Sequence, residues 1–134
     1  MSLQTAILNE TRTLFQTAHS GIPVDALEVS TRADGGVALK SVRVPSEYGY
    51  GKSQVTENAL LTFTIVTKSV SLLESILDTI YDFWEQKTDQ LTSGSDTYRI
   101  RQCLFSGEDK GGGEGASERY EATQTYEIEF NRIN

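Results

Sequence analysis

The chain has 134 residues, of which 19 are acidic and 12 basic, so its formal net charge is −7. This length fits a single domain spanning residues 1–134 with one core. The acidic balance argues against specific nucleic-acid binding, which normally needs a basic face, and against docking on anionic membranes. No apolar run approaches the roughly 20 residues of a membrane span, and the N-terminus lacks the pattern of a secretory signal.

Residues 3–18 are expected to form a helix, because apolar residues recur there at helical spacing. They are Leu3, Ile7, Leu14 and Phe15, with Ala18. The stripe is thin, so the helix is expected on the outside of the core. Gly21 and Pro23 then end it.

Residues 24–44 indicate two short strands around a turn signal at 33–36. The apolar alternation slips between Leu39 and Val42, which is typical of a bulge. Residues 45–58 follow as a long polar loop. Tyr48 and Tyr50 in this loop are candidate partner contacts, because tyrosine offers a large contact area with a polar tip. A solvated loop with its rings folded back on the domain explains them equally well.

Residues 60–85 organise the chain as a buried strand, a polar break and an amphipathic helix. In the strand, 59–67, the residues Leu61, Phe63 and Ile65 form the core face, and the opposite face is mixed. Ser69 or Ser71 is expected to cap the helix, and Ser71 with Glu74 fits a capping box.

The helix is expected to reach about Lys87. Its main apolar stripe consists of Val70, Leu73, Ile76, Leu77, Ile80, Tyr81 and Trp84. Leu72 and Phe83 lie at the margins and widen the apolar arc, so both are candidate subunit contacts. An exit loop is expected over 88–95.

The last third indicates a long β-hairpin with strands at 97–105 and 119–132. In the first strand, Tyr98, Ile100 and Leu104 are expected on one face. In the second strand the core face is Tyr120, Ala122, Tyr126, Ile128 and Phe130. The outer Arg99 and Arg101 are expected opposite the outer Glu127 and Glu129, and all four are candidate interface residues. The connection, 106–118, is glycine-rich, polar and acidic.

No motif in the sequence predicts a cofactor. Gly49 to Ser53 resembles the tail of a phosphate-binding loop, but Ser46 occupies the position of the first glycine and a strand follows instead of a helix. The glycines at 111–115 lead into no helix, so a linker is the better interpretation. No cofactor is therefore expected.

No catalytic or metal site is expected either, so the chain is predicted not to be an enzyme. His19 and Cys103 are the only residues of their kinds, which argues against a zinc site of the usual type. Cys103 is expected to be a small buried hydrophobe within a strand. Glu108, Asp109 and Glu114 could hold a hard cation loosely, although their spacing matches no calcium loop.

Together these elements predict an α+β fold, with a mainly antiparallel sheet of about four to five strands flanked by two helices and a long C-terminal hairpin. Three segments carry a family resemblance: LLTFTIVT (60–67), SLLESILDTIYDFWE (71–85) and RYEATQTYEIEFNRI (119–133). In a small acidic chain of this element order, they resemble the tail terminator, or tail completion, proteins of long-tailed bacteriophages.

The resemblance implies a structural virion protein without catalytic residues, assembled in the cytoplasm of a bacterial host. It implies a ring of identical subunits, typically a hexamer, which caps the tail tube and joins the tail to the head. The implied partners are therefore further copies of the chain, the tail tube and head-connector proteins.

Two alternatives remain open on the sequence. One is a head–tail connector or minor capsid protein of the same assembly. The other is a small ligand-binding domain or enzyme with a pocket between helix 71–86 and the sheet, lined by Tyr98, Tyr126 and Trp84. Gln102 and Gln124 would be its polar groups.

Overall fold

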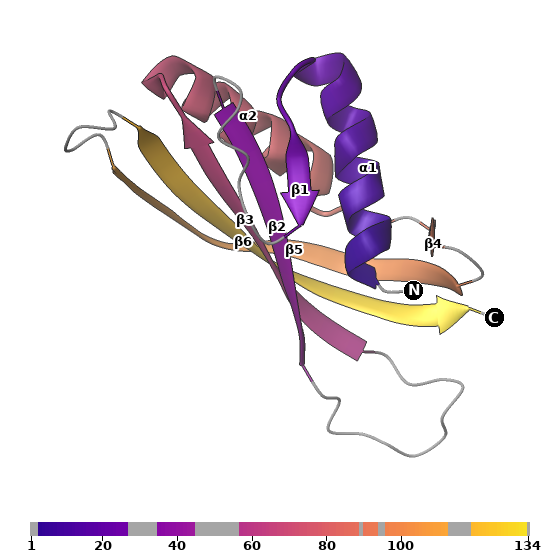
Figure 1. The fold of residues 1–134 in the computed structure, drawn as a ribbon. Coiled ribbons are helices and arrows are strands. Elements are labelled where there is room, and N and C mark those ends of the chain that lie inside the picture. The colour runs from indigo at the N-terminus through magenta and orange to yellow at the C-terminus, as the bar shows by residue number, and fades with distance from the viewer. Residues whose placement is uncertain are drawn as a thin grey trace.

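The computed structural model describes residues 3–26, 35–44, 57–88, 90–93, 96–112 and 119–133. Over these residues the chain forms two layers, a six-stranded sheet and two helices (Figure 1). The elements are α1 (Leu3–Ala18), β1 (Val24–Ala26), β2 (Gly35–Val44), β3 (Glu57–Thr67), α2 (Val70–Trp84), β4 (Gln90–Ser93), β5 (Asp96–Gly112) and β6 (Tyr120–Ile133).

The strand order is β1-β2-β3-β6-β5-β4, and every pair except β1 with β2 is antiparallel. The predicted α+β class and mainly antiparallel sheet are therefore confirmed. The strand count of four to five was too low, because β4 lies inside the expected exit loop. β1 runs parallel to β2, so the two strands do not form a hairpin around 33–36.

The start of β2 also differs from the expectation. Gly35 and Gly36 belong to the strand, where they pair with Thr67 and Val66 of β3. The pairing of β2 with β3 continues from Gly35 to Val44 without a register shift. The expected bulge between residues 39 and 42 was wrong: the slip in the apolar alternation does not disturb the backbone ladder.

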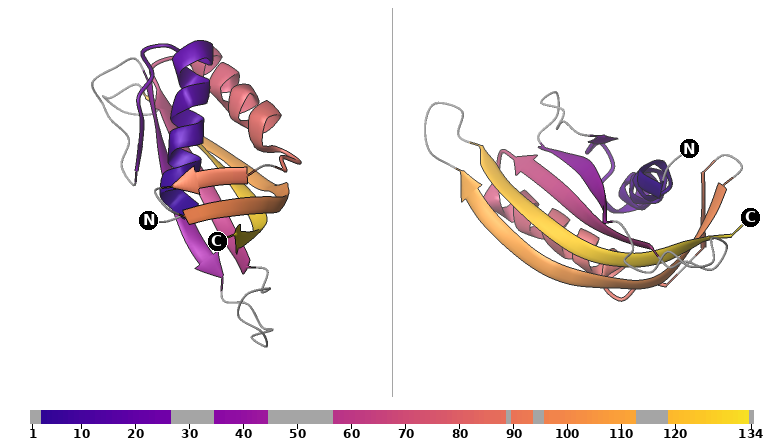
Figure 2. Two further views of the ribbon diagram at one scale, coloured as in Figure 1. Left: turned by 90° about the vertical axis from the view of Figure 1, so that its right-hand side faces the viewer. Right: turned by 90° about the horizontal axis from the view of Figure 1, so that it is seen from below.

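β5 and β6 form a hairpin that is longer than predicted and bent along its length (Figure 2). β5 continues to Gly112, through half of the connection that the sequence indicated as a loop. Two register shifts interrupt its pairing with β6, between Ile100 and Gln102 and between Phe105 and Gly107. Such bulges bend a strand and increase its twist, so the sheet curls, with α1 on its concave side (Figure 2).

α1 has the predicted bounds, but it is buried more deeply than a thin outer stripe implies. Ile7 is 0% exposed and Phe15 is 2% exposed. Its buried residues are Leu3, Ala6, Ile7, Leu8, Thr11 and Phe15. Thr11 is tolerated in this position because its hydroxyl donates to the carbonyl of Ile7 at 2.8 Å.

α2 begins one residue before the expected capping box. Ser69 is the N-cap residue, and its side chain accepts a hydrogen bond from the N–H of Leu72 at 3.1 Å. The Ser71–Glu74 box was therefore wrong, and Glu74 instead accepts a hydrogen bond from Lys110. The helix ends at Trp84, with Glu85 as C-cap, rather than near Lys87. Neither helix among the described residues is long and apolar enough to cross a membrane.

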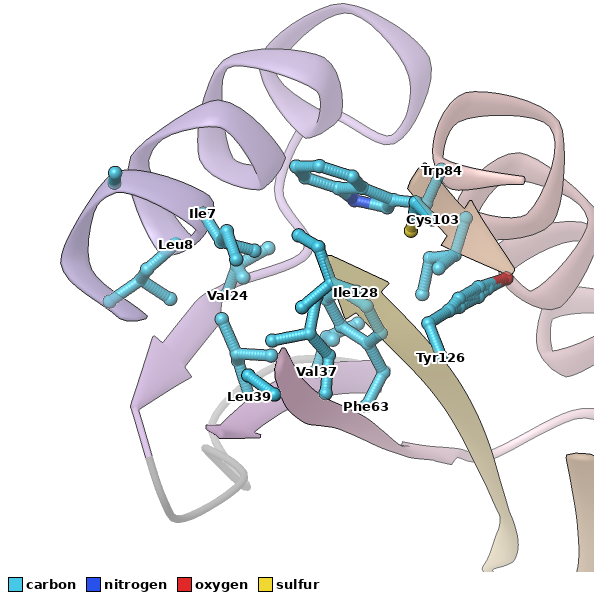
Figure 3. Close-up of a cluster of buried hydrophobic side chains, with 14 of the residues drawn as sticks. Ile7, Leu8, Val24, Val37, Leu39, Phe63, Trp84, Cys103, Tyr126 and Ile128 are labelled. Carbon is cyan, nitrogen blue, oxygen red and sulfur yellow. The ribbon is translucent and has the colours of Figure 1, made fainter. Parts of the chain in front are cut away.

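The core lies between the helices and the facing side of the sheet. β3 alternates as predicted, with Leu61, Phe63 and Ile65 fully buried. Side chains from α1, α2, β2, β3 and β6 meet in one cluster, in which Trp84 lies near Cys103 and Ile128 (Figure 3). This single cluster joins segments from both ends of the sequence.

Candidate interaction surfaces

The face of the sheet that points away from the core carries no helix among the described residues. On β3 its residues are half-buried rather than buried: Leu60, Thr62, Thr64 and Val66. Thr125 of β6 lies beside Thr62, with their hydroxyl oxygens 3.5 Å apart. The predicted contrast between one apolar and one mixed face is confirmed. A mixed, half-exposed face of this kind suits contact with another protein.

The charged interface candidates on the hairpin do not face one another as expected. The register places Arg99 opposite Asn131, and Arg101 lies in the bulge between Ile100 and Gln102. Glu129 lies opposite Gln102, and Glu127 lies opposite Leu104. The expected arginine–glutamate ladder was wrong because the bulge inserts one extra residue into β5.

Glu127 nevertheless occupies a distinctive position on the open face. It pairs with Leu60 of β3 on one side and with Leu104 of β5 on the other. Leu104 is 39% exposed, although the alternation predicted it on the core face. The first bulge reverses the alternation, so Cys103 points into the core instead.

The two candidate subunit contacts at the margins of α2 pack mainly against residues of the same chain. Leu72 and Phe83 are half-buried and pack against the core. The Phe83 ring meets Trp84 edge-on, with centroids 5.0 Å apart, and Lys87 places its ammonium 3.8 Å from the Phe83 centroid. The exposed apolar residues of α2 are instead Val70 and Tyr81, which the sequence placed in the main stripe.

An aromatic row that the sequence did not predict leads from the core to the surface. Tyr81 and Phe105 meet edge-on at 5.3 Å, and Phe105 meets Tyr126 at 5.7 Å. Tyr126 is fully buried, whereas Tyr81 is 41% and Phe105 37% exposed. The register shift between Ile100 and Gln102 brings Phe105 opposite Tyr126, and nothing in the local pattern signals it.

Trp84, Tyr98 and Tyr126 do not line a pocket between α2 and the sheet. All three side chains are fully buried and pack as part of the core. Gln124 fills the polar role there: its Nε2 donates to the carbonyl of Leu77 at 3.1 Å, and its Oε1 accepts from the Tyr126 hydroxyl at 3.1 Å. Burial raises the pKa of the Tyr126 phenol, so this group stays protonated and donating.

The single cysteine and the single histidine both make contacts that hold the fold together. Cys103 is fully buried, as predicted, and burial together with the nearby Glu85 raises its thiol pKa to about 12. His19 lies at the end of α1, with Nε2 2.8 Å from the Thr79 hydroxyl of α2. This contact links the two helices, so it gives the histidine a structural role.

Of the three carboxylates that could hold a cation loosely, Glu108 and Asp109 do not share a face of the sheet. Glu108 and Asp109 are successive residues of β5, so they point to opposite faces of the sheet. Glu114 lies outside the described residues, as do Tyr48 and Tyr50. Over the described part of the chain, no three side chains of the metal-binding types come together.

A shallow cleft of 410 Å³ lies between α1 and β1, lined by Arg12, Phe15, Ile22 and Val24 among others. Arg12 is its charged group, and its Nε already donates to the carbonyl of Val24 at 2.7 Å. The guanidinium also lies 3.9 Å from the Asp25 carboxylate. Arg12 is thus engaged in holding α1 to the edge of the sheet.

Several edges of the sheet are covered by groups from the helices. Besides Arg12, Gln4 of α1 donates to the carbonyl of Leu39, where β1 stops pairing with β2. On β5, the N–H of Gln86 donates to the carbonyl of Cys103 at 2.7 Å, and Glu85 accepts from the N–H of Phe105. These contacts satisfy edge groups that would otherwise be open to another strand.

Comparison with known proteins yields a likeness of fold. No protein-family model matches the sequence, and no curated protein matches it. The fold matches a chain in the structure of the virion of a native gene transfer agent particle, with a TM-score of 0.73. The match covers 97% of this chain and 95% of that chain at 12% sequence identity. The α+β architecture described above is therefore similar, over nearly its whole length, to that of a chain in a virion structure.

Proposed function

We propose that the chain is a structural subunit of a phage-like virion, and within it a ring-forming tail terminator. The observation that carries this proposal is the match to a chain of a gene transfer agent virion, which spans nearly the full length of both chains. The core position of Trp84, Tyr98 and Tyr126 supports it, because these side chains are packed where a ligand pocket would need space. The chain would accordingly be non-catalytic, and located in the virion after assembly in the host cytoplasm.

The segments with the phage resemblance form one unit of the fold. Residues 60–67 lie in β3, residues 71–85 comprise most of α2 with its C-cap, and residues 119–133 contain β6. β3 and β6 pair directly over eleven residues, from Glu57 to Thr67. The resemblance therefore concerns the centre of the sheet and the helix that covers it, which supports a common architecture.

The surfaces also suit an assembled subunit. The open face of the sheet is half-buried, mixed in character and rich in threonine. The two large side chains on the aromatic row, Tyr81 and Phe105, remain partly exposed. Tyrosine and phenylalanine at a surface are typical of protein contacts.

The proposal is tested by the mass of the purified chain in solution and by electron microscopy. A closed ring of identical subunits, which binds to one end of purified tail tubes, is the expected result. Binding to the head vertex instead would identify a connector or minor capsid protein. A strict monomer at high concentration that binds a small molecule tightly would contradict the virion role.

A further inference from the structure

Besides the outer edges of the short terminal strands β1 and β4, two strand segments keep an edge that no described strand pairs with. The first is Gly107–Gly112 at the end of β5, which pairs with β6 on one side only. β4 covers β5 at Asp96–Arg99, and the residues after α2 cover it at Cys103 and Phe105. Beyond that point the strand continues toward the hairpin end (Figure 1).

The first segment is accessible to another backbone. Glu108, Asp109 and Lys110 are exposed, and a Cβ on Gly107 would meet no atom within 4 Å. Glycine in a strand often marks a place where a second backbone approaches closely. The segment is also held in place, because the Lys110 ammonium lies 2.6 Å from the Glu74 carboxylate of α2.

The second segment is Lys40–Val44 at the end of β2. β1 pairs with β2 only as far as Leu39, and Gln4 covers the carbonyl of that residue. β2 continues for five more residues beside β3. Among the described strands, β3 is therefore the sole neighbour of this part of β2.

The charges of the two segments are complementary. In sequence, Gly107–Gly112 contains Glu108 and Asp109 with a single lysine, whereas Lys40–Val44 contains two basic residues and no acid. Lys40 pairs with Thr62 and Asp109 with Thr123, so both lie on the open face of the sheet. Charges at an edge oppose indiscriminate pairing but allow a strand of opposite charge.

The directions of the strands also agree. β2 is antiparallel to β3, β3 to β6, and β6 to β5, so β5 runs antiparallel to β2. A second copy placed beside the first, with its sheet continuing in the same sense, would present β2 antiparallel to β5. The two segments belong to different sides of the sheet, so this contact is head-to-tail and generates a ring or a filament.

We propose that the end of β5 in one copy pairs with the end of β2 in the next copy, and that this strand pairing joins the subunits. The closure of the ring rests on the proposed function, whereas the strand pairing itself does not. Within one sheet, Lys110 of β5 lies level with Val37 of β2, because Lys110 pairs with Ala122, Ala122 with Ile65, and Ile65 with Val37. Pairing of Lys110 with Ser41, four residues further along and beyond β1, offsets neighbouring copies by about 13 Å. An offset of this kind tilts the strands, as in closed barrels.

Disulfide trapping tests the contact. Cysteine replaces Asp109 together with either Val42 or Val44, two positions of β2 beyond its pairing with β1 that cover two registers of the contact. Mild oxidation is expected to give a ladder of covalent oligomers for at least one pair. Cys103 stays silent because it is buried. The matched control joins V42C to T123C, one strand inside the edge, where the distance exceeds disulfide reach.

Charge reversal supplies the second test. Asp109→Lys and Lys40→Asp are each expected to weaken subunit association about tenfold per contact, and the double variant to restore it. The control is Asp78→Lys on the exposed side of α2, which should leave association unchanged. Thermal unfolding of each variant verifies that the monomer still folds.

The outcomes separate this contact from the proposed function. A ring that forms without cross-links, and that ignores both reversals, overturns the strand pairing and leaves the virion role standing. Cross-linked filaments or dimers that never close support the pairing and contradict the ring. A chain that stays monomeric and gives no ladder contradicts both.

Discussion

The carboxylate of Glu85 accepts a hydrogen bond from the backbone N–H of Phe105 at 2.6 Å. Next to it, the N–H of Gln86 donates to the carbonyl of Cys103. The two residues after α2 thus occupy the place that a neighbouring strand would take beside β5. An uncovered edge at this point would offer a template for unspecific pairing, and Glu85 and Gln86 cover it.

Replacing Glu85 with alanine is expected to lower the free energy of unfolding by about 1–2 kcal/mol, because the N–H of Phe105 loses a charged acceptor. The same change exposes the edge of β5 and should increase irregular aggregation on concentration. Chemical denaturation and light scattering measure the two effects. Glu121→Ala, at an exposed position of β6, is the control. Equal behaviour of the two variants would show that Glu85 does not protect the edge.

The N-cap of α2 gives a comparison between two serines. Ser69→Ala is expected to cost about 1 kcal/mol of stability, because it removes the acceptor of the Leu72 N–H. Ser71→Ala should be close to neutral, because Ser71 is an exposed residue of the first turn. Urea denaturation of both variants decides the matter. A larger loss for Ser71 would mean that the capping box predicted from the sequence does form.

Elements with a clean local period were predictable from the sequence. The apolar spacing of α1 predicted its bounds, and the alternation in β3 and β6 predicted the correct core faces. These segments are long, and their period is set by burial on one side only. The centre of the fold, β3 with α2 and β6, is therefore recognisable in the amino-acid sequence alone.

The features that depend on distant partners were not predictable. The bulge after Ile100 turns Leu104 outward, and no local pattern marks where a strand gains a residue. β4 is too short to show a period, and the parallel partner of β1 lies beyond residues 27–34. The edge contacts likewise join residues far apart, as with Gln4 and Leu39.

The thiol of Cys103 predicts a loss of stability in alkali. Its pKa rises from the ordinary value of 9.0 to about 12 in the fold, so the folded chain retains a proton that the unfolded chain releases. Below about pH 9 the thiol is protonated in both states and has no pH-dependent effect. Above that pH, the free energy of unfolding should fall by up to about 1.4 kcal/mol per pH unit.

Denaturation of the protein at about pH 7 and about pH 10 measures this dependence. The control is Cys103→Ala, which should be less stable at neutral pH through its lost packing but should show a shallower alkaline decline. Tyr126 contributes in the same direction at higher pH, because burial also raises its pKa. Identical alkaline slopes in the variant and the original chain would contradict the assignment to Cys103.

Trp84 offers the last test, because it is the only tryptophan and is fully buried. No polar atom of the described residues accepts a hydrogen bond from its Nε1. Trp84→Ala should cost about 3–5 kcal/mol. Trp84→Phe should cost under about 1.5 kcal/mol, because it preserves most of the apolar volume and removes a buried donor that has no acceptor.

The emission of this single tryptophan should be blue-shifted in the folded chain and should shift to the red on unfolding, which gives the reference transition. The variants, which lack the fluorophore, are followed by circular dichroism. Phe83 lies beside Trp84 but is half-buried. The stability loss of Phe83→Ala should therefore fall between those of Trp84→Phe and Trp84→Ala. If Trp84→Phe proves as costly as Trp84→Ala, the indole N–H has an acceptor, such as a buried water, that contributes to the stability of the core.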